Sequence, residues 1–517
     1  MAHPVESRHL DHSPTRVFFL PLAVYFMGHI FIRILRGGAL ELDEAEQLIF
    51  SQWLLPGYSS QPPLYTWLQF VFVKIFGKSV LAVSLLKNAL LFLAYTFLFF
   101  GARKVYGKVD LARIVALSPF FILQISWGAQ RDLTHSVLLF ATESATFFAI
   151  VGLLVNRSIP YYGLLGLFLG LGFLSKASFG LFSISFIIAL ATTKEGHLTL
   201  LNKRSLSSLA IVLLVTLPYD VWAFSHIDIA ARSVHKLHLF GQGEIYRVLG
   251  KLFVSCIAVL SPFFLVFFLI FGKALSRPKR SSEINPLYFP LLRYFPILLG
   301  LLVILVAVFD VTRFKNRWLA PLLVIVPVAA FQYLNTKNVS AQMIRRFTLA
   351  LGIIAIGILS IMGLRNTICP KFGYFTDLSY PSSAIAQEAR HLGYAKGIII
   401  ASSHVAAANL LMQFPRSIAL HPGLSFVPPE ITNYQGQVLL LWNRQHSPEL
   451  PPYLKNFIEK RLGIKIRKGR IALKNIRYPN TNGRIAKIGL LLFEHHGLGK
   501  HNDSTMPLSR PLCPKSN

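Results

Sequence analysis

The amino-acid sequence predicts an α-helical polytopic membrane protein that ends in a small extracytoplasmic α/β domain. Of its 517 residues, 53% are hydrophobic and only 14% are charged, whereas soluble domains carry about 25% charged residues. Apolar runs long enough to cross a bilayer recur over the first 364 residues. These runs are continuous rather than alternating, so they predict spanning helices and not a barrel.

The net charge of +30 does not indicate a nucleic-acid partner, because loops of membrane proteins collect Lys and Arg on the cytoplasmic side. The cysteines, Cys256, Cys369 and Cys513, show no C-x-x-C spacing and indicate neither a metal site nor a disulfide framework. His235 and His238 could share a helical face, but no carboxylate completes a metal triad. We therefore assign no cofactor, and a divalent metal stays open.

The first apolar run, Val17–Leu35, is interpreted as an uncleaved anchor helix after a cytoplasmic leader, residues 1–16, because no good cleavage site follows it. The next segment contains several acidic residues and no Lys or Arg, which places it outside by the positive-inside rule. Leu64–Phe76 is too short to cross comfortably. We expect it to lie at the outer face, within a first outer loop at 37–78.

The lengths of the apolar runs predict about eleven spans, and every second loop between them is basic, as expected for the cytoplasmic side. They lie at Val17–Leu35, Val80–Phe100 and Leu111–Trp127, and near 133–155, 160–175, 178–193, 206–224, 248–271, 287–309, 316–334 and 345–364. The spanning domain is thus residues 17–364, with the N-terminus cytoplasmic.

Residues 365–495 are predicted to form the extracytoplasmic α/β domain. Short apolar runs predict strands at 397–401, 437–442 and 488–493, and helical patterns occur at 383–391 and 453–461. Residues 496–517 are polar and are expected to be disordered.

Acidic residues open a helix in the first outer loop. Asp43, with Glu46 three residues on, matches a capping-box variant. A carboxylate at such a place, beside Glu44, also suits a general base. Asp132 ends a predicted helix on the same side of the membrane. The two acids could act as a base with an orienting partner, hold a metal, or be unrelated caps.

Cations gather on the outer side as well. Lys176 lies in a very short hairpin between two spans, which favours a functional role for its charge. The alternative is structural, because a lysine at a helix end often extends its charged group to the membrane surface. Arg313, Lys315 and Arg317 break the positive-inside pattern at one tight outer turn, which indicates anion binding. Together with Arg131, they could neutralise a phosphate leaving group.

Several outer motifs, taken in order, resemble the GT-C membrane glycosyltransferases of the protein O-mannosyltransferase group. The chain is similar to bacterial members such as the lipid A aminoarabinose transferase and the rhizobial galacturonosyltransferases over roughly residues 17–330. The motifs are Asp43-Glu44, Gly57-Tyr58 with Pro62-Pro63-Leu64, Arg131-Asp132, Gly170–Lys176 and Arg317–Pro321.

The resemblance implies catalytic roles for Asp43, Glu44 and Asp132 and donor-phosphate contacts by Lys176 and Arg317. It also places Tyr58, Gln61, Pro62 and Pro63 beside the substrate cleft. Gln61 is a departure, because the aminoarabinose transferase has Lys before Pro-Pro-Leu. A phosphate contact at this place is therefore not assumed.

The predicted function is an inverting glycosyltransferase that uses a polyprenyl-phosphate-sugar donor. Its acceptor would be lipid A, lipopolysaccharide core, another glycolipid or a protein at the outer face of the membrane. One alternative is a transporter or flippase, but such proteins place charges and broken helices near the bilayer midplane. Another is a polymerase or ligase of surface polysaccharide.

Overall fold

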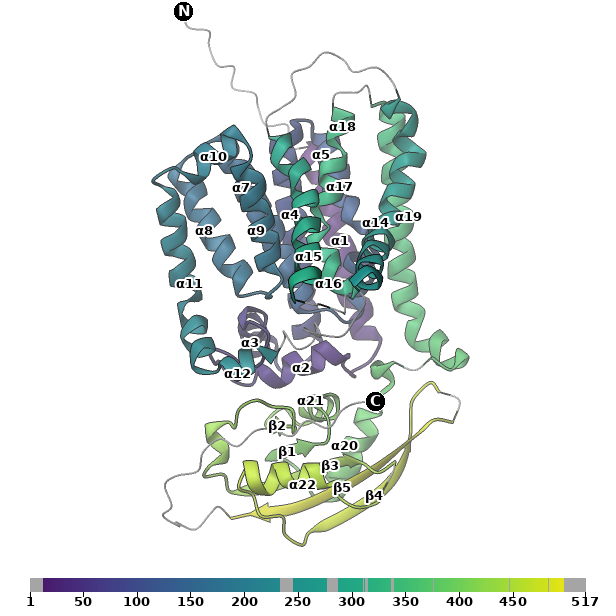
Figure 1. The fold of residues 1–517 in the computed structure, drawn as a ribbon. Helices are drawn as coiled ribbons and strands as arrows, with labels where there is room; N and C mark the ends of the chain where they lie inside the picture. The colour runs from purple at the N-terminus through teal and green to yellow at the C-terminus, as the bar shows by residue number, and fades with distance from the viewer. Residues whose placement is uncertain are drawn as a thin grey trace, which may run out of the picture.

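The computed structural model describes residues 13–232, 245–276, 287–309, 311, 315–335, 339–374, 376–445, 447–481 and 483–496. A bundle of long helices stands on a smaller α/β domain, and two shorter helices lie between them (Figure 1). This arrangement confirms the predicted fold class. The expected leader up to residue 12, the tail from 497, and the residues His235, His238 and Arg313 lie outside the described residues.

Among the described residues, seven helices are long and apolar enough to cross a membrane. They are α1 (Ser13–Leu35), α4 (Val80–Tyr106), α7 (His135–Val155), α11 (Ser205–Ser225), α14 (Ile245–Leu275), α15 (Tyr288–Phe309) and α19 (Ala341–Ile368). Three bent helix pairs raise the number to ten. The remaining expected span corresponds to α8 (Ile159–Phe173), which has 15 residues.

Three of the expected spans correspond to bent helix pairs in the structure. The first joins α5 (Val109–Leu117) and a 3₁₀ turn to a π turn and α6 (Ala129–Arg131), with a bend of 76°. The second joins α9 (Phe179–Ala191) to α10 (Lys194–Leu200) at 116°, and the third joins α16 (Asn316–Leu322) to α17 (Ile325–Ala330) and α18 (Gln332–Asn335) at 42°. Pro119 stands at the start of the 3₁₀ turn in the first pair, where its ring cannot continue an α-helix.

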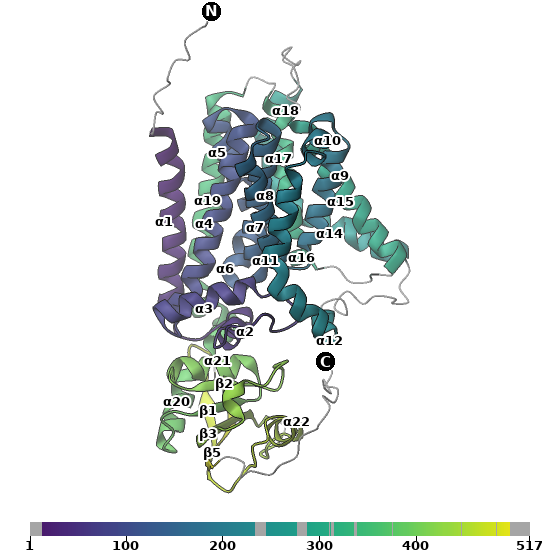
Figure 2. The same cartoon turned by 90° about the vertical axis from the view of Figure 1, so that its left-hand side faces the viewer.

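Two short helices, α2 (Leu42–Phe50) and α3 (Leu64–Phe76), separate the bundle from the C-terminal domain. The bounds of α3 are those expected, and it lies across the ends of the long helices (Figure 2). The N-cap of α2 is Glu41 rather than Asp43, which corrects the predicted capping box. The Glu41 N–H donates to Glu44 Oε2 at 3.2 Å, so the pair that closes the helix start lies two residues earlier than expected.

The C-terminal domain contains one five-stranded sheet in the order β2-β1-β3-β5-β4. Its strands are β1 (Ile398–Ala401), β2 (Ile418–Leu420), β3 (Gly436–Asn443), β4 (Arg470–Arg477) and β5 (Ile485–His495). β1 is parallel to β2 and β3, and β5 is antiparallel to β3 and β4. The three predicted strands are confirmed as β1, β3 and β5, whereas β2 and β4 were missed.

Three α-helices belong to this domain: α20 (Ser382–His391), α21 (His404–Gln413) and α22 (Pro452–Asn456). The helices expected at 383–391 and 453–461 are found, the second continuing into a π turn at Phe457–Arg461. α21 was not predicted. It packs against α2, and both belong to one hydrophobic core that also includes the strands of the sheet. The first outer loop and the C-terminal domain are therefore a single packed unit.

Candidate active site

Asp43 and Asp132 meet where α2 touches the end of α6. The backbone N–H of Asp43 donates to Asp132 Oδ1 at 3.1 Å. Asp43 is the second residue of α2, so this bond satisfies one of the N–H groups that a helix start leaves without an intrahelical partner. Because the backbone makes the contact, the Asp43 side chain is not used for it. Asp132 follows the bent helix pair that begins with α5, and this bend brings it to the start of α2.

The surroundings of Asp43 favour a proton acceptor that works near neutral pH. Burial raises the pKa of Asp43 to about 7, and the negative charges of Asp132 and Glu46 act in the same direction. Arg317 and Lys87 oppose them. A carboxylate with this pKa is about half ionised at neutral pH and mostly ionised above it, and it holds a proton more firmly than an ordinary aspartate does.

Glu44, although adjacent in sequence, occupies a different environment. Its side chain is 1% exposed and pairs with Arg33 Nη2 at 2.7 Å and with Lys87 Nζ at 3.0 Å. Burial alone would raise the pKa of Glu44, but the two cations outweigh it and hold the pKa below its ordinary value. Arg33 also donates to the Ala39 carbonyl at 2.8 Å. Glu44 therefore ties α2 to α1 and α4, and each of its two carboxylate oxygens is paired with a cation.

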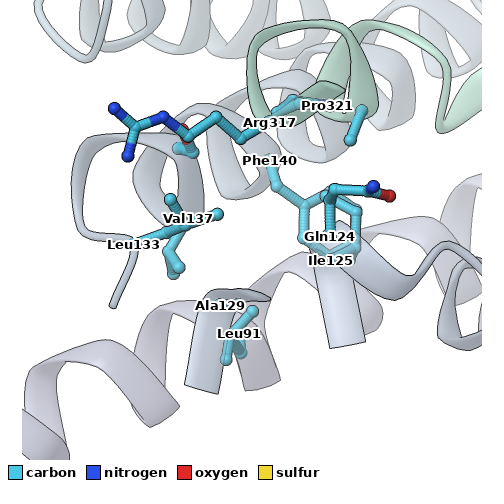
Figure 3. A pocket seen from close by; sticks show the side chains of 11 residues that line it. Leu91, Gln124, Ile125, Ala129, Leu133, Val137, Phe140, Arg317 and Pro321 are labelled. Carbon is cyan, nitrogen blue, oxygen red and sulfur yellow. The ribbon is translucent and has the colours of Figure 1, made fainter. Parts of the chain in front are cut away.

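A pocket opens beside the two aspartates, between the end of α6, the start of α7 and α16. Its lining is mainly apolar and comprises Leu91, Gln124, Ile125, Ala129, Leu133, Ser136, Val137, Phe140, Arg317, Ala320 and Pro321. Figure 3 shows the Arg317 side chain running past Val137, with its guanidinium group directed away from the apolar side chains. Within the described part of the chain, Arg317 makes no hydrogen bond or ion pair.

Lys176, in the turn after α8, contacts a residue that lines this pocket. Its Nζ donates to Ser136 Oγ at 2.8 Å, and Ser136 lines the pocket with Arg317. The structure thus brings Asp43, Asp132, Lys176 and Arg317 to one place from four separate elements. The charges of Asp132 and Arg317 both act on Asp43, and Arg317 lines the adjacent pocket, which is an arrangement suited to transfer from an anionic leaving group.

Other predicted cations lie at the margin. Lys315 stands over the Trp318 ring at 5.6 Å, an attraction between a cation and an aromatic face. Arg131 is exposed. Neither side chain lines the pocket that contains Arg317.

The turn before α3 is fixed to the turn that carries Lys176. The N–H of Leu64 donates to the Leu174 carbonyl at 3.1 Å, and Pro62 and Pro63 are buried beside it. Gln61 is half-buried, and its N–H donates to Ser59 Oγ at 3.2 Å. This segment therefore remains near the site.

Tyr58 lies elsewhere, in the core shared with the C-terminal domain. It is 1% exposed, and its hydroxyl donates to the Trp53 carbonyl at 2.7 Å. The Ser425 hydroxyl of the C-terminal domain donates to the Tyr58 carbonyl. The structure thus gives Tyr58 a packing role and does not bring it to the expected cleft.

Sequence reasoning missed a hydrogen-bond chain centred on His135. Gln47 Nε2 lies 3.1 Å from His135 Nε2, and His135 Nδ1 lies 3.2 Å from the Ser175 carbonyl. Thr66 donates to Gln47 Oε1 at 2.7 Å. With the proton on Nδ1, His135 accepts from Gln47 and donates to Ser175. The chain links α2, α3, α7 and the Lys176 turn. Gln47 stands four residues after Asp43, a helical spacing that could have drawn attention to it.

Residues 60–222 match the family model described as dolichyl-phosphate-mannose-protein mannosyltransferase. The lipopolysaccharide core galacturonosyltransferase RgtA of Rhizobium johnstonii is 30% identical over 436 residues, which cover 82% of this chain and 86% of RgtA. The chain belongs to the GT-C membrane glycosyltransferases. RgtB of the same organism, also a lipopolysaccharide core galacturonosyltransferase, is 29% identical over 455 residues, covering 86% of this chain and 91% of RgtB.

The fold of this GT-C glycosyltransferase is also that of a solved structure. ArnT from Cupriavidus metallidurans bound to undecaprenyl phosphate superimposes with a TM-score of 0.61 at 12% identity, covering 93% of this chain and 98% of ArnT. The predicted multi-pass membrane glycosyltransferase is thus confirmed in family and in fold. The transporter alternative has no support from these likenesses.

Proposed function

We propose that the protein transfers a sugar from a polyprenyl-phosphate carrier to a hydroxyl group of a cell-envelope glycolipid, with inversion at the sugar. One observation carries the proposal: the Asp43–Asp132 pair lies beside a pocket lined by Arg317, whose guanidinium group makes no hydrogen bond or ion pair with the residues that the structure describes. The names of RgtA and RgtB favour a galacturonosyl group and a lipopolysaccharide core acceptor. The undecaprenyl phosphate bound to ArnT favours a polyprenyl carrier.

In the proposed reaction, Asp43 takes the proton from the acceptor hydroxyl as its oxygen attacks C1 of the sugar. The bond between C1 and the phosphate oxygen breaks, and its electron pair leaves with the polyprenyl phosphate. Arg317 and Lys176 neutralise the negative charge that grows on this phosphate. No general acid is needed, because a phosphate leaves without being protonated.

Asp132 and Glu44 act on the base rather than on the substrates. Asp132 holds the N–H of Asp43 and adds a negative charge that makes the Asp43 carboxylate a better proton acceptor. Glu44 fixes α2 through Arg33 and Lys87. We therefore assign Asp43 as the base, and Asp132 and Glu44 as positioning residues.

The proposed location is the inner membrane, with the N-terminus in the cytoplasm and the C-terminal domain outside. The acidic first outer loop and the basic loops on the opposite side support this orientation. The polyprenyl chain would lie in the bilayer, with its phosphate at the level of Arg317. The acceptor glycolipid would approach from the outer leaflet.

The direct test is transfer by the full-length protein in liposomes. Undecaprenyl-phosphate galacturonic acid is supplied with purified lipopolysaccharide core, and mass spectrometry follows the acceptor. We expect the mass of one hexuronosyl residue (the acid minus one water) to be added to the core and free undecaprenyl phosphate to appear. Transfer from a nucleotide sugar, with none from the lipid-linked donor, would contradict the proposal.

Arg317→Ala and Lys176→Met test the phosphate contacts. A hydrogen bond to a charged group contributes about 1.5–3 kcal/mol. Each variant should therefore lower kcat/KM for the donor roughly tenfold to a hundredfold, with little change in the KM for the acceptor. Arg113→Ala, which removes a cation paired with Asp110 away from the site, serves as the control. A larger effect on the acceptor than on the donor would remove the assignment.

A further inference from the structure

The segment that carries Asp43 is held at its start by the C-terminal domain. The N–H of Leu40, two residues before α2, donates to Asn409 Oδ1 at 3.0 Å. Asn409 belongs to α21 and is 0% exposed, and its Nδ2 donates to the Val405 carbonyl at 2.8 Å. Both ends of the Asn409 amide are thus used, and one of them fixes the chain that enters α2.

The chain that leaves α2 is held in the same way. Gln52 Oε1 accepts from the Ala419 N–H at 2.9 Å, and Gln52 Nε2 donates to the Ala419 carbonyl at 2.9 Å. Ala419 lies in β2, the end strand of the sheet, and its register partner on the other side is Ile399 of β1. The Gln52 amide therefore takes the place of a neighbouring strand at this edge.

Apolar packing joins the two polar contacts. Leu48, Ile49 and Phe50 of α2 are buried in the core that also contains the strands of the sheet. One residue after Gln52, Trp53 Nε1 donates to Glu430 Oε2 of the C-terminal domain at 3.1 Å. Both Figures 1 and 2 show α2 directly above this domain, with α21 and β2 beneath it.

The contacts of α2 thus divide between two sides. Asp43 and Glu44, near its start, contact groups of the bundle, namely Asp132, Arg33 and Lys87. The flanking residues Leu40 and Gln52 and the apolar face contact the C-terminal domain. A shift of that domain would move α2 against the bundle and change the place of Asp43.

We propose that the C-terminal domain positions the catalytic base, and that Asn409 and Gln52 are the positioning residues that hold α2 at its two ends. This inference rests on the proposed role of Asp43. It gives the domain a part in the chemical step, because a displacement of about 1 Å at a reacting group can lower a rate about a hundredfold. Neither residue touches the pocket, so neither is expected to affect donor binding.

Asn409→Ala in the full-length enzyme tests the inference, with Tyr394→Phe as the matched control. The Tyr394 hydroxyl donates to Ser417 Oγ at 2.9 Å, which is a buried hydrogen bond between two residues of the same domain. We expect Asn409→Ala to lower kcat about tenfold to a hundredfold at an unchanged donor KM. Tyr394→Phe should leave kcat within about twofold. Equal losses of kcat in the two variants, in proportion to their loss of thermal stability, would overturn the inference.

The pH profile gives a second readout. The groups that act on the charge of Asp43 are Asp132, Glu46, Arg317 and Lys87, and Tyr65 of α3 also lies near it. If α2 loosens, Asp43 becomes more hydrated and moves away from Asp132, so its pKa falls toward the ordinary value. The acid limb of kcat in Asn409→Ala should therefore move to lower pH. A lower kcat with an unmoved acid limb would contradict positioning.

A double-substitution cycle separates this inference from the assignment of the base. In the Asp43→Asn background, Asn409→Ala should cause no further loss of kcat, because the group that it positions has been removed. An undiminished tenfold loss in that background would overturn positioning and leave the base assignment standing. Full activity of Asp43→Asn alone would instead overturn the base assignment, whatever Asn409→Ala does.

Discussion

Replacing Asp43 with Asn should lower kcat by about 10³-fold, because a positioned general base contributes roughly 10²–10⁴ to a rate. Asn has the same shape but cannot accept the proton of the acceptor hydroxyl. The contact with Asp132 uses the backbone N–H of Asp43, so the substitution leaves it in place. The start of α2 should therefore stay fixed, and the loss should be confined to the chemical step. Initial rates at saturating donor and acceptor measure it.

The control for Asp43→Asn is Asp110→Asn, which removes a carboxylate at the start of α5 that pairs with Arg113. Both variants should insert into the membrane in wild-type amounts, and only Asp43→Asn should lose transfer. If Asp43→Asn kept the wild-type kcat, the proton would have to go to another group. Asp132 would then be the candidate, since it is the nearest other carboxylate in the site.

The wild-type enzyme should show an acid limb near neutral pH. Burial raises the pKa of Asp43 to about 7, helped by Asp132 and Glu46 and opposed by Arg317 and Lys87. Because the base must be ionised, kcat should fall about tenfold for each pH unit below this value and level off above it. The limb should disappear in the residual activity of Asp43→Asn. A limb that stays at the same pH in that variant would belong to a different group.

The four residues proposed for the site could be singled out from the sequence because their signal is local. Asp43 and Asp132 follow or precede apolar runs on the side that the loop charges mark as outer, and Lys176 and Arg317 stand at turns between such runs. The bounds of α3 could be predicted for the same reason, from a run between Pro63 and Gly77. Such features can be recognised from the order of residues along the chain and from the side of the membrane on which they lie.

The role of Glu44 could not be predicted, because its partners are distant in sequence. Arg33 and Lys87 stand 11 and 43 residues away, inside or at the ends of apolar runs. The sequence around such a charge does not indicate which residue it pairs with. The hydrogen-bond chain through His135 has the same character. Periodicity gives the faces of helices, but not which faces meet.

Strand β4 was missed for a physical reason of its own. It is an end strand rich in Arg and Lys, with most of its side chains exposed, so it lacks the apolar run that revealed β1, β3 and β5. Strand β2 has three residues, too few for a periodic signal. Its edge is occupied by the side chain of Gln52, a contact that only the folded chain shows.

Glu44→Gln should be the most destabilising of the substitutions considered, because it leaves two buried cations without their anion. Removing one partner of a buried ion pair costs about 3–5 kcal/mol. The side chains of Glu44 and Lys87 are 1% and 2% exposed, so both charges are shielded from bulk water. The loss should appear as a large fall in the thermal unfolding midpoint of the detergent-solubilised protein. Because α2 is tied to α1 and α4 through this residue, kcat should fall as well.

A double substitution shows whether the loss comes from the stranded cations. Lys87→Met together with Glu44→Gln removes one cation and its anion, leaving Arg33 with the Gly37 and Ala39 carbonyls that it already contacts. The double variant should therefore be more stable than the sum of the single losses predicts, by about 1–3 kcal/mol. Strict additivity would mean that Glu44 and Lys87 contribute independently. In that case the position of α2 would be fixed by the C-terminal domain and not by the ion pairs of Glu44 with Arg33 and Lys87.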